Sequence, residues 1–181
     1  MNDNWSEFKL RVNIRVPLDK VYPAWATPAG LESWFLRKAA ITGGSPLRGE
    51  ARDEAGPNGQ TTAQRPANSL AQTGDRYEWY WHGYPESMVE KGTITAANGS
   101  NHFAFTFGVD YPVSISLYRE CDETIVELVE SGLPTDEERL LKRYVGDSKG
   151  WIFYLTNLKS ILEGGLDLRN HRPELANVIT A

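Results

Sequence analysis

The sequence contains little sulfur and few histidines. Its 181 residues include one cysteine and three histidines. Cys121 therefore has no partner for an intrachain disulfide, and the N-terminal segment has charged and amide residues where a signal peptide would be apolar, so we expect a cytoplasmic protein. Because His82, His102 and His171 are far apart in the sequence and no HExxH pattern occurs, we expect no metal site.

Long hydrophobic runs and an excess of positive charge are also missing. No stretch approaches the ~18 to 20 consecutive apolar residues that a membrane span requires. Lys and Arg total 19 against 24 Asp and Glu, which gives a net charge of -5, and no basic cluster offers a surface for phosphate backbones. The glycine-rich motifs that hold nucleotide phosphates are absent. We therefore expect no membrane span, no nucleic-acid partner and no cofactor.

The composition is otherwise that of a globular protein. Hydrophobic residues make up 40% of the chain and aromatic residues 11%, which is enough apolar material for a core. The length fits one domain over residues 1–181. A flexible polar segment, at about residues 43–74, is rich in glycine and proline, and we expect short strands there plus a mobile tip near Ala55–Ala67.

Hydrophobic periodicity predicts a series of strands. They lie at Glu7–Val16, Arg76–His82, Met88–Ala96, His102–Phe107, Val113–Tyr118 and Thr124–Glu130. In the first of them the even-numbered residues are apolar, so we expect that face to be buried. The Asn98-Gly99 pair is a hairpin signal. Together these strands predict an antiparallel meander.

Two short helices and one long helix complete the prediction. The first covers Leu18–Ala26, and the second follows Thr27 as N-cap, with Pro28 at its first position. The long helix begins with a capping box at Thr135–Glu138 and ends at Gly164-Gly165, a span of about 28 residues or ~42 Å. Its apolar stripe consists of Leu141, Tyr144, Val145, Ser148, Trp151, Ile152, Leu155, Leu158, Lys159 and Leu162.

Glycines inside this long helix need a reason. Gly146 and Gly150 each cost about 1 kcal/mol in a helix interior. We expect them to mark either a close approach to another element or a kink. The order of elements predicts an α+β fold in which the long helix covers the sheet, and the two can separate near one end to leave an apolar pocket.

One carboxylate stands out among many. Glu130 shares its strand face with Val126 and Leu128, so its side chain is predicted to point inward. A buried carboxylate without a partner would have a raised pKa and could move a proton, whereas a salt-bridged or rim-exposed glutamate would be structural. The charges of Glu90-Lys91 and of Asp136–Arg139 are interpreted as solvated faces or cap chemistry.

Several segments resemble a known superfamily. They are IRVPLDKVYPAWATPAGLESWF (Ile14–Phe35), GDRYEWYWHGYPE (Gly74–Glu86), HFAFTF (His102–Phe107), ESGLP (Glu130–Pro134) and GWIFYLTNLKSILEGGLDLR (Gly150–Arg169). In content and order they resemble the START-like (SRPBCC, Bet v 1-like) superfamily. Within it they are most similar to the family homologous to the C-terminal domain of the activator of the heat-shock-protein-90 ATPase. The resemblance covers a core of residues 7–169 and leaves 170–181 as a tail.

The resemblance implies a helix-grip fold, a curved antiparallel sheet wrapped around a long C-terminal helix. In such domains, a cavity between the sheet and the helix commonly binds a hydrophobic small molecule. By position, the candidate lining residues are Tyr77, Trp79, Trp81, Phe103, Phe105, Phe107, Glu130, Trp151 and Tyr154. The aromatic residues on the strands, Trp79, Trp81, Phe103, Phe105 and Phe107, are more typical of an ordinary core than of a cavity lining, because buried aromatic side chains usually just pack. Two features depart from the family: similar sequences often have His at the position of Glu130, and residues 49–71 replace a short hairpin.

Three functions stay open at this stage. The first is the binding of a lipid-like or aromatic metabolite without catalysis. The second is a polyketide cyclase or dehydratase, in which Glu130 moves a proton, with Tyr154 or His82 assisting. The third is a module that binds a chaperone through the sheet edge or the 43–74 segment. The true activators have an additional N-terminal domain, which we do not expect here, and we therefore do not expect ATPase stimulation either. A homodimer is compatible with each.

Overall fold

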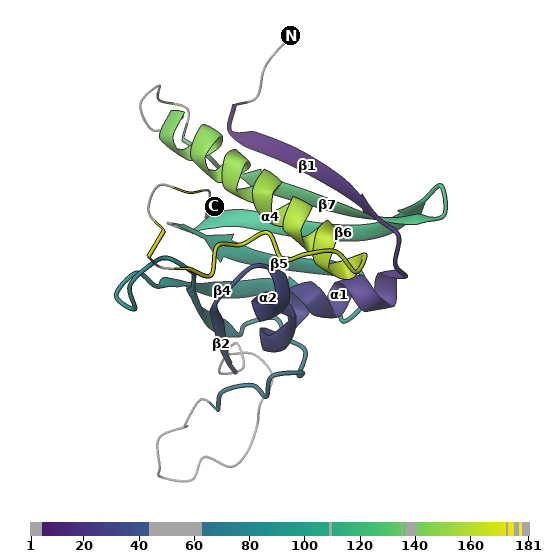
Figure 1. Cartoon of the computed structure of the whole chain (residues 1–181), viewed down its shortest axis with the longest axis horizontal. Helices are drawn as coiled ribbons and strands as arrows, with labels where there is room; N and C mark the ends of the chain where they lie inside the picture. The colour runs from purple at the N-terminus through teal and green to yellow at the C-terminus, as the bar shows by residue number, and fades with distance from the viewer. Residues whose placement is uncertain are drawn as a thin grey trace, which may run out of the picture.

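The computed structural model describes residues 5–43, 63–108, 110–134, 136, 141–172, 174–175 and 178. In these residues a seven-stranded antiparallel sheet carries its helices on one face (Figure 1). The elements are β1 (Glu7–Ile14), α1 (Leu18–Ala26), α2 (Pro28–Trp34), β2 (Lys38–Thr42), β3 (Arg76–Tyr80), β4 (Glu90–Ala97), β5 (His102–Phe107), β6 (Tyr111–Glu120), β7 (Glu123–Ser131), the π-helical turn η1 (Leu141–Val145) and α4 (Gly146–Leu162).

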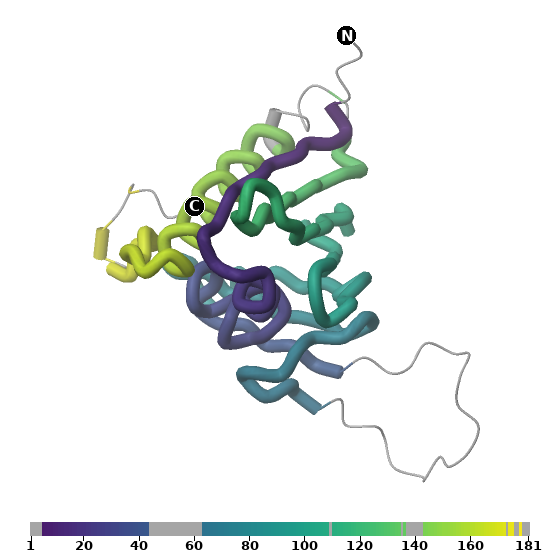
Figure 2. The backbone as a smooth tube through the Cα atoms, turned by 90° about the vertical axis from the view of Figure 1, so that its right-hand side faces the viewer, coloured from purple at the N-terminus to yellow at the C-terminus, as the bar shows by residue number. Residues whose placement is uncertain are grey.

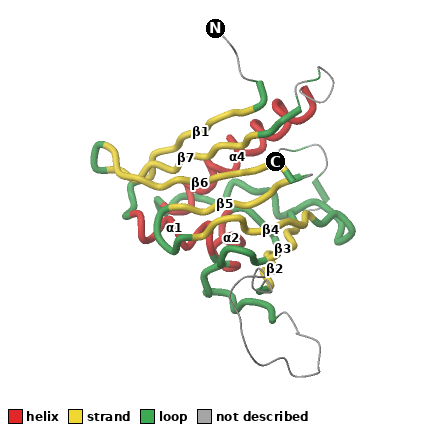
Figure 3. The backbone as a smooth tube through the Cα atoms, turned by 180° about the vertical axis from the view of Figure 1, so that it is seen from behind, coloured by secondary structure: helices red, strands yellow, loops and turns green. Residues whose placement is uncertain are grey.

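The first and the last strand of the chain are neighbours in the sheet. Its order is β1-β7-β6-β5-β4-β3-β2, so β2 to β7 form a meander and β1 returns to the edge beside β7. Glu7 faces Ser131 and Ile14 faces Thr124 in that antiparallel pair. Figure 2 shows α1, α2 and α4 together on the same side of the sheet, and Figure 3, from behind, shows the uncovered face. Charged residues occupy that face, where Lys91 Nζ lies 2.6 Å from Glu78 Oε1.

The predicted capping of the second short helix is confirmed. The Thr27 hydroxyl oxygen accepts a hydrogen bond from the Gly30 backbone N–H at 2.9 Å, and Pro28 occupies the first turn. A Cβ atom on Gly30 would lie 2.1 Å from the Pro23 carbonyl oxygen. A residue without a side chain at this position therefore allows α1 and α2 to pack closely.

Aromatic side chains dominate the core between helices and sheet. Trp25 and Trp34 are both fully buried, with ring centroids 4.6 Å apart. On the sheet side, Tyr77 and Trp79 stack with centroids 3.8 Å apart. The Trp34 indole N–H donates to the Ala24 carbonyl at 2.9 Å, which satisfies a donor that would otherwise be buried without a partner.

The segment after α4 is fastened to the end of α2. Arg169, only 8% exposed, donates hydrogen bonds of 2.9 Å to the carbonyl oxygens of Glu32, Ser33 and Leu36. These carbonyls lie at the C-terminal end of α2, where a cation is electrostatically favoured. The fully buried Asn157 of α4 donates to the Trp34 carbonyl at 2.6 Å. Both contacts fix the end of α2 against α4.

The α+β architecture predicted from the sequence is confirmed, with local corrections. Strand β2 was not predicted, because KAAIT has only one large apolar residue and two alanines of weak strand propensity. The predicted α-helix is wrong over Leu141–Val145, which form the π-helical turn, and α4 covers 17 residues from Gly146. Residues 135 and 137–140, where the predicted helix begins, lie outside the described residues. Ile152, predicted for the apolar stripe, is 54% exposed and the prediction is wrong there.

Other predictions fall partly outside the described residues. Of the predicted capping box, Thr135, Glu137 and Glu138 lie there, as do residues 55–62 of the predicted mobile tip. In the polar segment the structure records an isolated bridge between Thr42 and Gln64. Among the described helices, none is long and apolar enough to cross a membrane.

Candidate functional site

A pocket of about 460 Å³ lies between α4 and the sheet. Its walls come from five parts of the fold: η1 and α4, the end of α2, the end of β5, the β3–β4 connection and the start of β4. The lining residues are Phe35, Trp81, Tyr84, Met88, Val89, Glu90, Phe107, Gly108, Arg143, Gly146, Asp147, Gly150, Trp151 and Tyr154. This size falls within the range of small-molecule sites.

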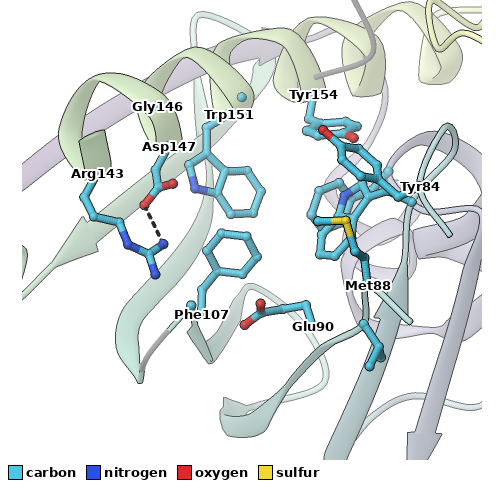
Figure 4. A pocket seen from close by; sticks show the side chains of 14 residues that line it. Tyr84, Met88, Glu90, Phe107, Arg143, Gly146, Asp147, Trp151 and Tyr154 are labelled. Atoms are coloured by element: carbon cyan, nitrogen blue, oxygen red, sulfur yellow. Dashed lines mark hydrogen bonds and ion pairs between the residues drawn. The ribbon is translucent and has the colours of Figure 1, made fainter. Parts of the chain in front are cut away.

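One part of the pocket is aromatic. Figure 4 shows Tyr84 and Tyr154 on one side, and Trp151 and Phe107 in the middle. The Trp151 and Phe107 ring centroids are 5.4 Å apart. Tyr84 and Met88, on the β3–β4 connection, are 41% and 54% exposed, so they form a rim that is open to solvent.

The opposite part of the pocket is charged. Arg143 Nη1 lies 3.3 Å from Asp147 Oδ2, one helical turn further along (Figure 4). The Arg143 guanidinium also packs over the Tyr111 ring, 5.1 Å from its centroid. Glu90, at the start of β4, contributes a third charged side chain, and burial raises the pKa of its carboxyl group.

Glu130 lies behind this charged part and is fully buried, as its strand face predicted. Its Oε2 accepts a hydrogen bond from the Trp151 indole N–H at 2.7 Å. Its other oxygen, Oε1, is buried and has no hydrogen-bond partner among the described residues. The carboxyl group of Asp147 lies near enough for the two groups to influence each other's pKa. Burial, followed by the nearby Asp147 charge, raises the pKa of Glu130 to about 8. Burial likewise raises the pKa of Asp147.

Two carboxyl groups that lie near each other in a buried site titrate as a pair. Near neutral pH the pair of Glu130 and Asp147 holds a proton that two exposed carboxylates would have released. Asp147 lines the pocket, whereas Glu130 does not. The arrangement can therefore present either a hydrogen-bond donor or an acceptor to the pocket through Asp147.

Three glycines shape the pocket walls. A Cβ atom added to Gly146 or Gly150 would meet nothing within 4 Å, so these glycines do not mark close packing, the first of the two reasons considered from the sequence. The second reason, a kink, stays a prediction, and the π-helical turn η1 ends immediately before Gly146. Gly108 has φ +61°, and a Cβ atom there would lie 2.6 Å from Arg143 Nη2. Gly108 thus leaves room for the guanidinium.

The predicted lining residues separate into three groups. Trp81, Phe107, Trp151 and Tyr154 line the pocket. Tyr77, Trp79, Phe103 and Phe105 are at most 1% exposed and belong to the hydrophobic core behind it. Glu130 does not line the pocket, but it accepts the hydrogen bond of the Trp151 indole N–H.

Most of the other lining residues were not predicted from the sequence. Glu90 was interpreted as part of a solvated face because it adjoins Lys91, but its Oε1 atom is buried. The sequence pattern did not single out Asp147 or Arg143, since only an apolar stripe was predicted for the long helix. The glycines at 146 and 150 were the available clue, because helix interiors without close packing rarely retain glycine.

A second cavity, of about 410 Å³, adjoins the first at Tyr84. It is lined by Arg37, His82, Gly83, Tyr84, Pro85 and His171. The two imidazole rings lie 4.1 Å apart. Burial, and then the neighbouring imidazole, lowers the pKa of His82 to about 4. His82 is therefore neutral at pH 7. Among the described residues, no group of three or more side chains is arranged to hold a metal ion.

The sheet, the long C-terminal helix across it and the pocket between them define a helix-grip protein. No protein-family model and no curated protein matched the sequence. Solved structures with the same fold include protein SSP2350 from Staphylococcus saprophyticus, with a TM-score of 0.63 and 18% identity over 90% of this chain and 96% of that one.

Two further structural neighbours carry informative names. DynU16, described as a protein in the dynemicin biosynthetic locus, has a TM-score of 0.62 and 15% identity over 92% of this chain and 50% of that one. The Aha1 dimer from Colwellia psychrerythraea has a TM-score of 0.57 and 16% identity over 88% of this chain and 97% of that one. At these identities the likeness establishes a shared fold.

Proposed function

We propose that this protein binds a hydrophobic small molecule in the pocket between α4 and the sheet. The observation that carries the proposal is the pocket itself, which is about 460 Å³ in volume and has six aromatic side chains in its lining. Buried apolar surface drives such binding, and a few polar groups orient the ligand. Trp81, Phe107, Trp151 and Tyr154 are the aromatic residues that we expect to contact it.

The helix glycines support this proposal. Each glycine weakens α4 by about 1 kcal/mol relative to alanine, yet neither Gly146 nor Gly150 has a neighbour that forbids a side chain. Both line the pocket. A requirement for free volume explains why the helix keeps them.

The test compares ligand binding by the wild type, whose pocket is open, with binding by a variant whose pocket is filled by a side chain. A panel of neutral apolar molecules, including 2-naphthylmethanol and decanol, is added to the protein while the thermal midpoint is followed. At about 100 times its Kd, a ligand stabilises the native state by about 2.7 kcal/mol. Gly150→Leu places a side chain in the pocket and should remove the stabilisation. Ile152→Leu, on the 54% exposed side of the same helix, is the matched control and should keep it.

Either of two results would contradict the proposal. One is a panel without any stabilising ligand, together with native mass spectra that show no co-purified molecule. The other is equal stabilisation of the wild type and the Gly150→Leu variant, which would place the bound molecule elsewhere.

A second candidate is an enzyme of the cyclase or dehydratase type. The observation that favours it is the pair of neighbouring carboxyl groups, with Asp147 on the pocket wall and Glu130 fully buried behind it. In such an enzyme Asp147 would exchange a proton with the ligand, and Glu130 would exchange one with Asp147. DynU16, from a biosynthetic locus, shares the fold. Tyr154 lines the same pocket, whereas His82 lies at the second cavity.

Carboxyl titration by ¹³C NMR tests this candidate. Titration of Glu130 near pH 8 supports it, because the acid then keeps its proton at neutral pH. A midpoint near the ordinary glutamate value of about 4.3 would remove the basis for an acid role.

The third function, binding to a chaperone, rests on the resemblance to Aha1 alone. That neighbour is a dimer. A pull-down with the cognate chaperone, together with sedimentation to detect a homodimer, tests both associations. Absence of binding and of changed ATP turnover would remove the chaperone from consideration.

A further inference from the structure

We infer that the ligand carries an ammonium group, which the charged end of the pocket binds through Glu90 while aromatic side chains surround the rest of the molecule. This inference rests on the proposed binding function and specifies the chemistry of its ligand. It follows from an unpartnered carboxylate oxygen, from aromatic ring faces and from the distribution of charge around the pocket.

The carboxylate of Glu90 supplies the first argument. Glu90 lines the pocket, as does Phe107 (Figure 4). The Gly108 backbone provides one hydrogen bond to this carboxylate. Its Oε1 atom is buried and has no hydrogen-bond partner among the described residues. A buried carboxylate oxygen without a donor is costly. A cation in the pocket beside this carboxylate would stabilise its negative charge.

The aromatic wall supplies the second argument. Organic cations bind over the faces of Trp and Tyr rings, because the ring quadrupole is negative there. Of the aromatic lining residues, Trp151 lies between the two tyrosines and the charged part of the pocket (Figure 4). The protein already uses this interaction next to the pocket, where Arg143 lies 5.1 Å from the Tyr111 ring centroid. Aromatic rings combined with a carboxylate are the usual surroundings of a bound ammonium group.

The charge distribution supplies the third argument. Among the described lining residues Arg143 is the cation, and its charge is matched by Asp147 at 3.3 Å. Glu90 forms no ion pair with any described residue within 4.0 Å, so its negative charge is the one left over. A ligand with a carboxylate or phosphate would meet this excess of negative charge, whereas a cation would neutralise it.

The experiment compares ligands that share an apolar body and differ in charge. The probes are 2-naphthylmethylamine, which is protonated at pH 7, neutral 2-naphthylmethanol and anionic 2-naphthoate. Affinities for the full chain are measured by calorimetry, and the indole N–H signals of Trp81 and Trp151 in NMR spectra report occupation of the pocket. The variants are Glu90→Gln and, as the matched control, Glu86→Gln, whose side chain is 69% exposed and lies outside the pocket.

We expect the amine to bind at least about tenfold more tightly than the alcohol, and the carboxylate to bind weakest. Glu90→Gln should lower the affinity for the amine by about tenfold while it changes that for the alcohol by less than about twofold. Glu86→Gln should change neither. The wild-type ranking needs no variant, so a folding defect of Glu90→Gln would leave the inference testable.

The outcomes separate this inference from the binding function. Equal affinities for amine and alcohol, or tightest binding of the carboxylate, would overturn the ammonium inference and leave the hydrophobic pocket in place. Failure of all three probes to bind, at millimolar concentration, would overturn both.

Discussion

The substitution of Gly150 by alanine gives a direct test of the pocket geometry. Gly150 lies inside α4, and its φ is not positive. Alanine exceeds glycine in helix propensity by about 0.5–1 kcal/mol, because glycine loses more backbone entropy on folding. An added Cβ atom would meet nothing within 4 Å, so no steric cost opposes this gain.

The expected result is a more stable protein. In a chain of this size 1 kcal/mol corresponds to about 2–4 °C, so Gly150→Ala should raise the thermal midpoint by about 1–4 °C. Urea unfolding followed by tryptophan fluorescence gives the free energy directly, and calorimetry gives the midpoint. Both measurements should agree on the sign.

The matched control is the same substitution in α2. Gly30→Ala gains the same helix propensity, but its Cβ atom would lie 2.1 Å from the Pro23 carbonyl oxygen and 2.7 Å from the Thr27 hydroxyl oxygen. Backbone movement is then required, and such overpacking costs about 1–3 kcal/mol or more. If Gly150→Ala were destabilising as well, the wall of the pocket at α4 would be closed, and the reasoning about free volume would be refuted.

Further predictions concern the residues around the pocket and at the end of α2. Trp151→Ala should destabilise the protein by about 3–5 kcal/mol, because the side chain is only 3% exposed; a loss below about 1 kcal/mol in urea unfolding would contradict its core position. The raised pKa of Glu130, about 8, means that the native state keeps a proton that the unfolded chain releases. Stability should therefore fall as the pH rises from about 5 to 8. Glu130→Gln should flatten this dependence, and an unchanged slope would exclude Glu130 as its source. Arg169→Lys should cost about 2–4 kcal/mol, because an ammonium group cannot reproduce the guanidinium bonds to three carbonyls; stability equal to that of wild type would show that these bonds are dispensable.

Most of the fold could be predicted because local sequence signals agree with the tertiary structure. Alternation in β1 and the Thr27 cap before α2 depend on neighbouring residues alone, and both signals were correct. Strand β2 has no strong local signal, since its position is determined by hydrogen bonds to β3. The start of α4 was also beyond local reasoning, because heptad-like spacing does not distinguish an α-helical turn from the π-helical turn at η1.

The candidate site was predicted less completely, for a reason visible at Trp79 and Trp81. Both have the same parity along the chain, so alternation assigns them to one face. β3 ends at Tyr80, however, and Trp81 lies beyond it. Trp79 is fully buried in the core, whereas Trp81 lines the pocket. Which aromatic residue borders a cavity depends on where elements end, and sequence patterns determine ends poorly.

The pairing of β1 with β7 has a consequence for the order of folding. The residues that face each other, from Glu7 with Ser131 to Ile14 with Thr124, are separated by more than a hundred positions. During synthesis β1 can pair with β7 only after nearly the whole sheet has left the ribosome. The part of the apolar face that α4 covers stays exposed until α4 follows. Such distant contacts make folding slow. We expect that nascent chains ending before α4 expose the aromatic face to solvent and depend on chaperones, and that the pocket is among the last features to form.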